Sequence, residues 1–445
     1  MEIKVVKFGG SSLADAQQFR KVAAIIQADP ARRYVVPSAP GKRFAGDDKV
    51  TDLLYRCYDM ASKGEDIDEE FDKITRRYSD IISELGMDFS LEKDFVQIKN
   101  AFLCHAGRDF AASRGEYLCG KVLAAYLGYP FIDAAGVIFF NEDGSFNAKL
   151  TNTILGAKLH GMEHAVIPGF YGAMPNDTIR TFSRGGSDIT GSRGARAADA
   201  DLYENWTDVS GCLMADPRIV TNPKTIRVIT YQELRELSYM GATVLHEDAI
   251  FPVRYAGIPI NIRNTNQPDA VGTLIVPNSK HPSYETKEII TGIAGKKGFS
   301  TFILEKDKMN DEVGFGRRVL QVFENHNICF EHLPSGVDTM CVILNNKDLD
   351  GIKDMLINEI CQAVEPDSIA IDENLALIAV VGRGMVKTKG TALRIFKSVA
   401  EANVNIRMID QGSSELNIII GVDESDFETA MRAIYQEFSE NNAIR

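Results

Sequence analysis

The chain has 445 residues, which is too long for one hydrophobic core, so we expect two or three domains. Its net charge of −13 argues against a nucleic-acid partner, because such a surface repels a phosphate backbone. Short apolar runs, the absence of a signal or transit peptide pattern and seven cysteines without a C-x-x-C pair predict a cytoplasmic protein with no membrane partner, disulfide framework or structural zinc site.

Apolar strand-like runs alternate with amphipathic helical stretches over residues 1–275. The strand-like runs are 3–8, 34–37, 166–170, 202–209 and 258–262, and the helical stretches between them include 115–127 and 231–240. This alternation predicts an α/β domain with a mostly parallel sheet that is covered by helices on both faces. Ligands of such sheets bind at the loops that follow the carboxyl ends of the strands, so we expect the chemistry there.

A polar, proline-containing segment at 276–290 is typical of a linker, and an internal repeat follows it. One constant offset relates the matching residues Met309 and Met385, Gly314 and Gly390, Arg318 and Arg394, Asn327 and Asn403, Gly336 and Gly412, and Met355 and Met431. Each copy is predicted to run strand, glycine loop, helix, Asn-containing turn, two strands and helix. We therefore expect a catalytic domain at 1–280 and small α+β modules at 291–372 and 373–445, with interleaving of the two modules left open.

Two short motifs match known patterns without the context that those patterns need. The run 115–122 nearly fits the phosphate-binding G-x-x-x-x-G-K-[ST] loop, but Val122 replaces the hydroxyl and the run lies within a helical stretch. The run from His160 to His164 fits an inverted zinc-protease pattern, but Gly161 interrupts the helix that would aim both histidines. We assign neither motif a function.

The segment 7–12 (KFGGSS) follows the first predicted strand. Its two glycines let the backbone approach a ligand closely, and Ser12 with Asp15 is predicted to form a capping box for the next helix. Lys7 before a glycine loop at a helix N-terminus is typical of a phosphate site. A tight strand–helix turn with an exposed lysine is the alternative reading.

Two later segments have residue types that suit anionic ligands. In 182–191 (FSRGGSDITG), Arg184 suits a carboxylate, the glycine amides suit an oxyanion, and Asp188 can hold a lysine or a metal ion. In 206–218, a strand ends in Thr-Asp and a loop closes on Asp-Pro-Arg, where Arg218 could contact a phosphate. An Asx turn with a proline stop is the alternative for that loop.

Together these motifs resemble the aspartate kinases of the amino acid kinase family. The matching strings occur in the family's order and are VVKFGGSSLAD, PSAPGK…TDLL, ASRGEYL, VIPGFYG, TFSRGGSDITG, WTDVSGCLMADPR and SYMGATVLH. The repeats resemble a pair of ACT modules, and NVNIRMIDQGSSELNIIIGV matches the second. The resemblance implies an amino-acid-kinase-type sheet sandwiched by helices, two ferredoxin-like ACT domains, and ATP-dependent phosphorylation of the L-aspartate side chain, the first step of lysine, threonine and methionine synthesis.

The resemblance also implies roles for individual residues. Lys7 would neutralise the transferred phosphoryl group and Asp188 would position Lys7, while Arg184 would bind the substrate α-carboxylate and Glu116 its α-ammonium. The residues that would bind the substrate are Ser38, Thr51, Glu116, Arg184, Gly186 and Ser187. The nucleotide side is Lys7, Gly9, Gly10, Thr207, Asp208, Leu213 and Arg218. ATP would bring Mg²⁺ with it, and no metal ligands of the protein itself are expected.

Three positions depart from the pattern of many relatives. Thr243 stands where a nucleotide-contacting lysine is common, Glu247 where a proline is common, and Leu213 where some relatives have a tyrosine near the nucleotide. These changes concern ATP binding and leave the expected reaction unchanged.

Regulation by an amino acid is expected from the ACT resemblance, with Met309, Phe315 and Glu331 at effector-lining positions. A carboxylate at 331 would suit the ammonium group of lysine, so we expect L-lysine as the inhibitor, with a surface glutamate as the alternative. ACT modules pair across subunits, which implies a homodimer or a dimer of dimers. Two other functions stay open: a related small-molecule kinase of the same fold, and a catalytically inactive amino-acid sensor, against which Lys7 and Asp188 argue.

Overall fold

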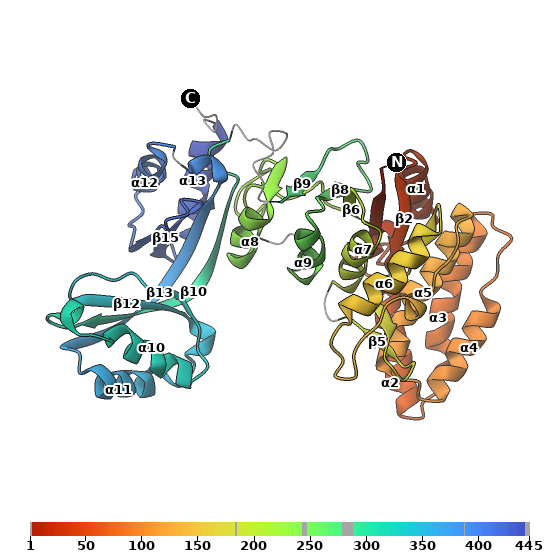
Figure 1. Ribbon diagram of the computed structural model, residues 1–445, viewed down its shortest axis with the longest axis horizontal. Coiled ribbons are helices and arrows are strands. Elements are labelled where there is room, and N and C mark those ends of the chain that lie inside the picture. The colour runs from red at the N-terminus through yellow and green to blue at the C-terminus, as the bar shows by residue number, and fades with distance from the viewer. Residues whose placement is uncertain (1, 183–184, 243–246, 278–287, 387, 441–445) are drawn as a thin grey trace. The chain divides into compact units, whose positions relative to one another are not determined.

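The computed structural model describes residues 2–182, 185–242, 247–277, 288–386 and 388–440 (Figure 1). The chain forms two compact units. The first contains residues 1–212, 225–231 and 244–284, and the second contains 213–224, 232–243 and 285–445. None of the described helices is both long and apolar enough to cross a membrane.

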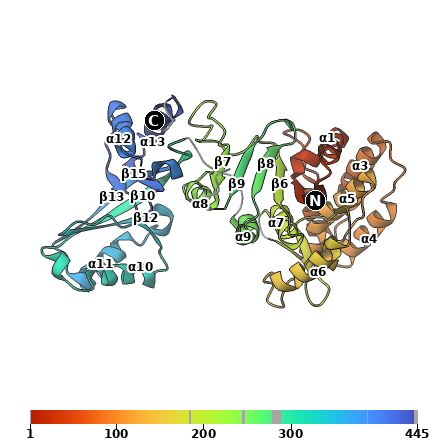
Figure 2. The same ribbon diagram turned by 45° about the horizontal axis from the view of Figure 1, so that its top comes forward.

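The first unit is built on a seven-stranded sheet with the order β3-β2-β1-β6-β8-β9-β7. Its strands are β1 (Lys4–Phe8), β2 (Arg32–Pro37), β3 (Ala165–Val166), β6 (Leu202–Thr207), β7 (Val228–Thr230), β8 (Ile260–Asn264) and β9 (Thr273–Val276). Every pair from β3 to β8 is parallel, and β9 is antiparallel to β8 but parallel to β7. Figure 2 shows β6, β8, β9 and β7 side by side in this order. The expected mostly parallel sheet is confirmed.

Helices cover both faces of this sheet. They are α1 (Ala16–Gln27), α2 (Val50–Ser62), α3 (Asp68–Glu84), α4 (Glu92–Leu103), α5 (Arg108–Leu127), α6 (Ala148–His160), α7 (Gly186–Ala197) and α9 (Glu247–Ala256). Val6 and Phe8 of β1 pack into one core with apolar side chains of α1 to α5, whereas α7 packs on β1, β2 and β6 and is itself flanked by α6 and α9. Because side chains alternate along a strand, Val5 and Lys7 face the α7 side.

Two local predictions are wrong. Asp15, and not Ser12, is the N-cap of α1, where its side chain accepts a hydrogen bond from the Gln18 amide at 2.9 Å. A 3-10 turn at Gly10–Leu13 takes up the residues that the capping box required, and the Ser12 hydroxyl instead lies 2.8 Å from that of Thr265. The expected strand 166–170 ends at Val166, because the chain turns away from the sheet toward the cavity described below.

The two rejected motifs lie where the sequence predicted. The run 115–122 lies inside α5, so it forms no phosphate loop. Helix α6 ends at His160 with Gly161 as its C-cap, so no continuous helix joins the two histidines.

The second unit contains a six-stranded sheet with the order β11-β12-β10-β13-β15-β14. Its strands are β10 (Gly292–Glu305), β11 (Phe330–His332), β12 (Thr339–Asn345), β13 (Ser368–Val381), β14 (Met408–Asp410) and β15 (Asn417–Asp423). Its helices are α8 (Tyr231–Tyr239, which begins in the first unit), α10 (Phe315–Asn325), α11 (Lys353–Val364), α12 (Thr391–Glu401) and α13 (Phe427–Glu440). Both repeats therefore have the predicted order of elements.

Matching residues of the repeats adopt matching backbone conformations. Gly314 and Gly390 precede α10 and α12 with φ of 82° and 84°, and Asn327 and Asn403 turn the chain with φ of 56° and 57°. These left-handed values favour glycine and asparagine. Strands β10 and β13 pair along their whole length, while β12 pairs with the second half of β10 and β15 with the second half of β13. The two modules thus share one continuous sheet.

Candidate active site

A cavity of about 310 Å³ opens among the loops at the carboxyl ends of β1 and β2. Its lining comes from β1, the β2–α2 loop, the start of α2, α5, the turn after β3 and the start of α7. The lining residues are Lys7, Ser38, Lys49, Thr51, Asp52, Glu116, Phe170, Gly185, Gly186, Ser187 and Asp188. Most of the residues expected on the substrate side therefore come together in one place.

Lys7, which is buried, and Asp188, which is partly exposed, form an ion pair in this cavity. The Lys7 side chain leaves β1 on the face covered by α7, and its Nζ lies 2.6 Å from Asp188 Oδ1. Asn205 on the neighbouring strand β6 completes the arrangement, because its Nδ2 donates to Asp188 Oδ1 at 2.8 Å and its Oδ1 accepts from Lys7 Nζ at 3.4 Å. The ammonium group is thus held in place by a carboxylate and an amide from two other elements. Asn205 was not predicted, although a polar residue within a buried strand is a signal for it.

The start of α7 supplies backbone amides to the cavity. Gly185 has a left-handed backbone with φ of 67°, and a Cβ on Gly186 would lie 2.4 Å from the Phe170 ring, so this close approach requires glycine. Phe170 itself has φ of 80° and is held by hydrogen bonds to Thr190 and Phe182. Strained residues of this kind concentrate at functional sites. The free amides of a helix N-terminus favour an anion.

Glu116 faces the cavity from the middle of α5 and is almost fully buried, with an exposed fraction of 6%. Burial raises the pKa of this carboxyl to about 8, although a hydrogen bond from the Ala39 backbone acts in the opposite direction. Its Oε2 has no hydrogen-bond partner among the described residues. A buried acceptor that opens on a cavity is suited to a ligand cation.

Ser38 and Thr51 lie at opposite ends of the loop that joins β2 to α2. The Ser38 amide donates to the Phe8 carbonyl at 3.0 Å, which continues the pairing of β1 and β2, and Thr51 belongs to the first turn of α2. Lys49 and Asp52 of the same region also line the cavity and were not predicted. Three polar residues within the short run KVTD, shortly after the string PSAPGK, are the signal that could have indicated them.

Four residues expected on the nucleotide side do not line the cavity but lie at the same edge of the sheet. Gly9 and Gly10 follow β1, Thr207 ends β6, and Asp208 follows it. The Gly9 amide donates to the Trp206 carbonyl at 3.0 Å, which joins the loop after β1 to the end of β6. The Thr207 hydroxyl donates to Asp208 Oδ1 at 3.1 Å. This edge is where α/β sheets bind nucleotides.

The remaining predicted residues lie elsewhere or outside the described residues. Leu213 and Arg218 belong to the second unit, where Arg218 pairs with Asp216 at 2.6 Å in the Asx turn that was the alternative reading. Arg184 and Thr243 are outside the described residues, as is the side chain of Glu247. Across the described ranges, no group of three or more His, Cys, Asp or Glu side chains could hold a metal ion.

The three expected effector residues belong to the first repeat. Phe315 is buried in the core of this module, and Met309 packs against the same core. Glu331 on β11 accepts a hydrogen bond from the Tyr239 hydroxyl of α8 at 2.5 Å. Burial and this carboxylate together raise the pKa of Tyr239 to about 12.

The fold and the Lys7–Asp188 site define a small-molecule kinase. The Lys7 ammonium group and the N-terminus of α7 lie together at the carboxyl ends of the parallel strands. The sequence model of the Amino acid kinase family matches residues 2–264, and that of an ACT domain matches residues 378–438. Aspartokinase 3 of Bacillus subtilis (strain 168) is 41% identical over 451 residues, which cover 98% of each protein. The chain therefore belongs to the aspartate kinases of the amino acid kinase family.

Solved structures agree with this assignment. The crystal structure of Clostridium acetobutylicum aspartate kinase has a TM-score of 0.88 at 53% identity and covers 98% of this chain and 100% of that one. The structure of E. coli aspartokinase III in complex with lysine and aspartate has a TM-score of 0.69 at 25% identity, with the same coverage of 98% and 100%.

Proposed function

We propose that this chain transfers the γ-phosphoryl group of MgATP to the side-chain carboxylate of L-aspartate, with the cavity as the aspartate site. The observation that carries the proposal is that one cavity holds the Lys7–Asp188 pair and the carboxyl group of Glu116, whose Oε2 has no hydrogen-bond partner among the described residues. The first can offset the charge of a phosphoryl group, and the second can bind the ammonium group of an amino acid.

The chemistry needs no general base, because the pKa of an aspartate side chain near 4 leaves the nucleophile ionised at neutral pH. The barrier then comes from bringing two anions together in line, which requires positioning and positive charge. Lys7, held by Asp188 and Asn205, supplies the charge, and the amides at the start of α7 add to it. Arg184, four positions before Asp188 in the sequence, would bind the α-carboxylate of the substrate.

ATP would bind at the same edge of the sheet. Gly9 and Gly10 would admit the phosphates, and Thr207 and Asp208 would contact the nucleotide. Mg²⁺ would arrive as part of the nucleotide and would offset the negative charge of its phosphates. The seven cysteines are all free thiols, which supports a reducing cytoplasm as the compartment.

The experiment that tests this proposal traps the acyl phosphate product with hydroxylamine in the presence of MgATP. We expect hydroxamate with L-aspartate and at least about 100-fold less with L-glutamate, because an extra methylene displaces the nucleophile from in-line geometry. Equal signal with glutamate or another carboxylate would favour a different kinase of the family. No signal from folded protein that still binds lysine or threonine would favour the inactive sensor.

We further propose that L-lysine inhibits the enzyme through the first ACT module and that subunits associate as a homodimer or a dimer of dimers through these modules. The E. coli relative that was solved with lysine and aspartate supports lysine as the ligand. In this chain Glu331 offers a carboxylate that is half-buried and hydrogen-bonded to Tyr239. An ammonium group would compete with the tyrosine hydroxyl for this acceptor.

Replacement of Glu331 with glutamine is expected to raise the lysine concentration for half inhibition by at least about tenfold, because a charge-assisted hydrogen bond is lost. The kcat without lysine should stay within about twofold, since Glu331 is outside the catalytic cavity. Inhibition curves for the hydroxamate assay measure both values. Glu324→Gln, an exposed change on α10, is the matched control, and unchanged inhibition of the Glu331 variant would rule out lysine recognition by this carboxylate.

A further inference from the structure

The guanidinium group of Arg77 lies where two loops of the catalytic unit meet. Arg77 projects from α3 and is buried, with an exposed fraction of 5%. Its Nη1 donates to the carbonyl oxygens of Gly41 at 3.0 Å and Ala14 at 3.4 Å, and its Nη2 donates to the Asp48 carbonyl at 3.2 Å. One side chain thus ties the segment after β1 to two points of the β2–α2 loop.

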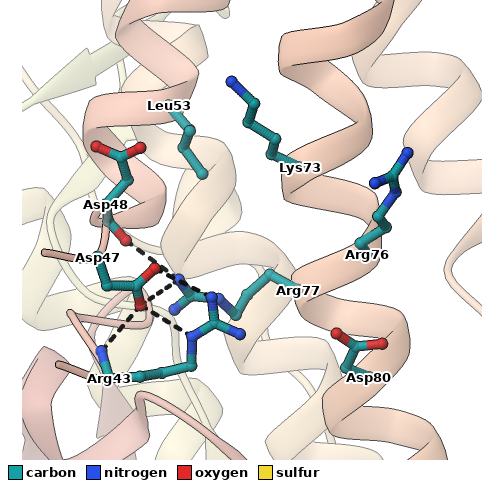
Figure 3. A pocket seen from close by; sticks show the side chains of 8 residues that line it. All are labelled: Arg43, Asp47, Asp48, Leu53, Lys73, Arg76, Arg77 and Asp80. Atoms are coloured by element: carbon teal, nitrogen blue, oxygen red, sulfur yellow. Dashed lines mark hydrogen bonds and ion pairs between the residues drawn. The ribbon is translucent and has the colours of Figure 1, made fainter.

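Asp47 holds this guanidinium in place (Figure 3). Its Oδ2 accepts from Arg77 Nη2 at 2.6 Å, and the same carboxylate accepts from Arg43 through the backbone amide, Nε and Nη2 at 2.9–3.0 Å. These hydrogen bonds, led by those from the Arg43 side chain and aided by the charge of Arg77, hold the pKa of Asp47 well below its usual range. The Asp47 carboxylate therefore stays ionised, and its hydrogen bonds to Arg43 join the two ends of the loop 43–47.

The two loops joined by Arg77 carry both halves of the proposed site. The loop after β1 contains Gly9 and Gly10, which we assign to the phosphates. The β2–α2 loop begins at Ser38 and leads into Lys49 and Thr51, all of which line the cavity. The Gly41 amide donates to the Gly10 carbonyl at 2.8 Å, and a Cβ on Gly10 would lie 2.8 Å from the Ala39 carbonyl, so the loops are in direct contact.

We infer that Arg77 is a positioning residue that holds the phosphate-binding loop and the aspartate-binding loop in register. Arg77 does not line the cavity, so it acts through the loops and not on the substrates. The inference rests on the proposed function. It adds to that function a residue outside the cavity lining that determines where the two binding loops lie. Arginine is required because a lysine in its place has no planar fork to reach Asp47 and three carbonyl groups at once.

The test is the Arg77→Lys enzyme, which keeps the charge next to Asp47. Displacement of both loops is expected to raise KM for aspartate and for MgATP by about tenfold each and to lower kcat by about tenfold, since misplacement near 1 Å can reduce rates up to about 100-fold. Calorimetric titration with MgADP should show a matching loss of affinity without relying on turnover. A merely structural role would reduce the fraction of active enzyme and leave both KM values unchanged.

Two further variants make the outcome decisive. Arg76→Lys is the matched control, because Arg76 is the preceding residue of α3, is exposed and only approaches Asp72 at 3.8 Å, and it should keep wild-type constants. Asp47→Asn should reproduce the kinetic defect, and the double variant with Arg77→Lys should be no worse than either change, as expected for groups that act together. Wild-type KM values in Arg77→Lys or additive effects would overturn the inference. An inactive wild-type protein would instead contradict the proposed function.

Discussion

Replacement of Lys7 with methionine is expected to lower kcat for aspartate phosphorylation by about 1,000-fold while the protein stays folded. Methionine retains the length and most of the volume of the lysine stem but removes the ammonium group that lies 2.6 Å from Asp188. Preorganised positive charge at a transferring phosphoryl group commonly contributes effects of this size, because it acts in a buried site without reorganisation. Initial rates of hydroxamate formation at saturating MgATP and aspartate measure the effect.

The control for this variant is Lys4→Met, on the same strand. The Lys4 ammonium pairs with Asp29 at 2.8 Å and does not line the cavity, so kcat should stay within about twofold. KM for aspartate in the Lys7 variant should change much less than kcat, since the charge is needed mainly in the transition state. A folded Lys7→Met enzyme with kcat within tenfold of wild type would remove Lys7 from the mechanism.

Above pH 8, replacement of Glu116 with glutamine is expected to lower kcat/KM for aspartate by about 100-fold, because the substrate ammonium loses its buried charged partner. The pH dependence gives a sharper test. In the free enzyme burial raises the pKa of Glu116 to about 8, so the carboxyl is neutral below that pH and cannot pair with an ammonium group. Wild-type kcat/KM should therefore rise about tenfold per pH unit from pH 6 toward 8, and this rise should be absent in Glu116→Gln.

Thermal unfolding without substrate supplies an independent measurement on the same variant. A carboxyl whose pKa is raised from 4.5 to about 8 by folding binds its proton more tightly in the folded state, so its contribution to stability falls as pH increases between these values. Glu116→Gln lacks this loss and should unfold at a higher temperature than wild type above pH 8. Glu92→Gln, exposed at the start of α4, should match wild type in both experiments. Wild-type kcat/KM that does not change with pH, together with equal unfolding temperatures of wild type and Glu116→Gln, would show that Glu116 does not bind the substrate ammonium group.

Local patterns in the sequence were sufficient for the architecture of this protein. The alternation of apolar strands and amphipathic helices predicted the mostly parallel sheet, because both faces of such a sheet must be buried by helices. The repeat was equally clear, since Gly314 and Gly390 occupy left-handed positions that few other residues tolerate. The alternation of strands and helices and the internal repeat both depend on residues close together in the chain, so the order of residue types is enough to predict them.

Local patterns were less reliable where one stretch of sequence is compatible with two local structures and the tertiary structure selects one of them. Ser12 and Asp15 are both good N-caps, and only the 3-10 turn after β1 determines that Asp15 is used. The apolar run after Val166 resembles a buried strand. In the structure the chain leaves the sheet after Val166, and the Phe170 ring packs closely against Gly186.

The sequence by itself determined the repeated modules and placed Lys7 at the end of a strand, because both depend on patterns along the chain. Its resemblance to the aspartate kinases indicated Ser38, Thr51 and Glu116, which the fold brings into one cavity with Lys7. Only the tertiary structure brought Asn205 against Lys7 and Asp188, and Arg77 against Asp47 and Gly41. These partners lie on separate elements, so no spacing along the chain relates them. Their roles depend on burial and on distances of about 3 Å, which arise when the helices pack on the sheet.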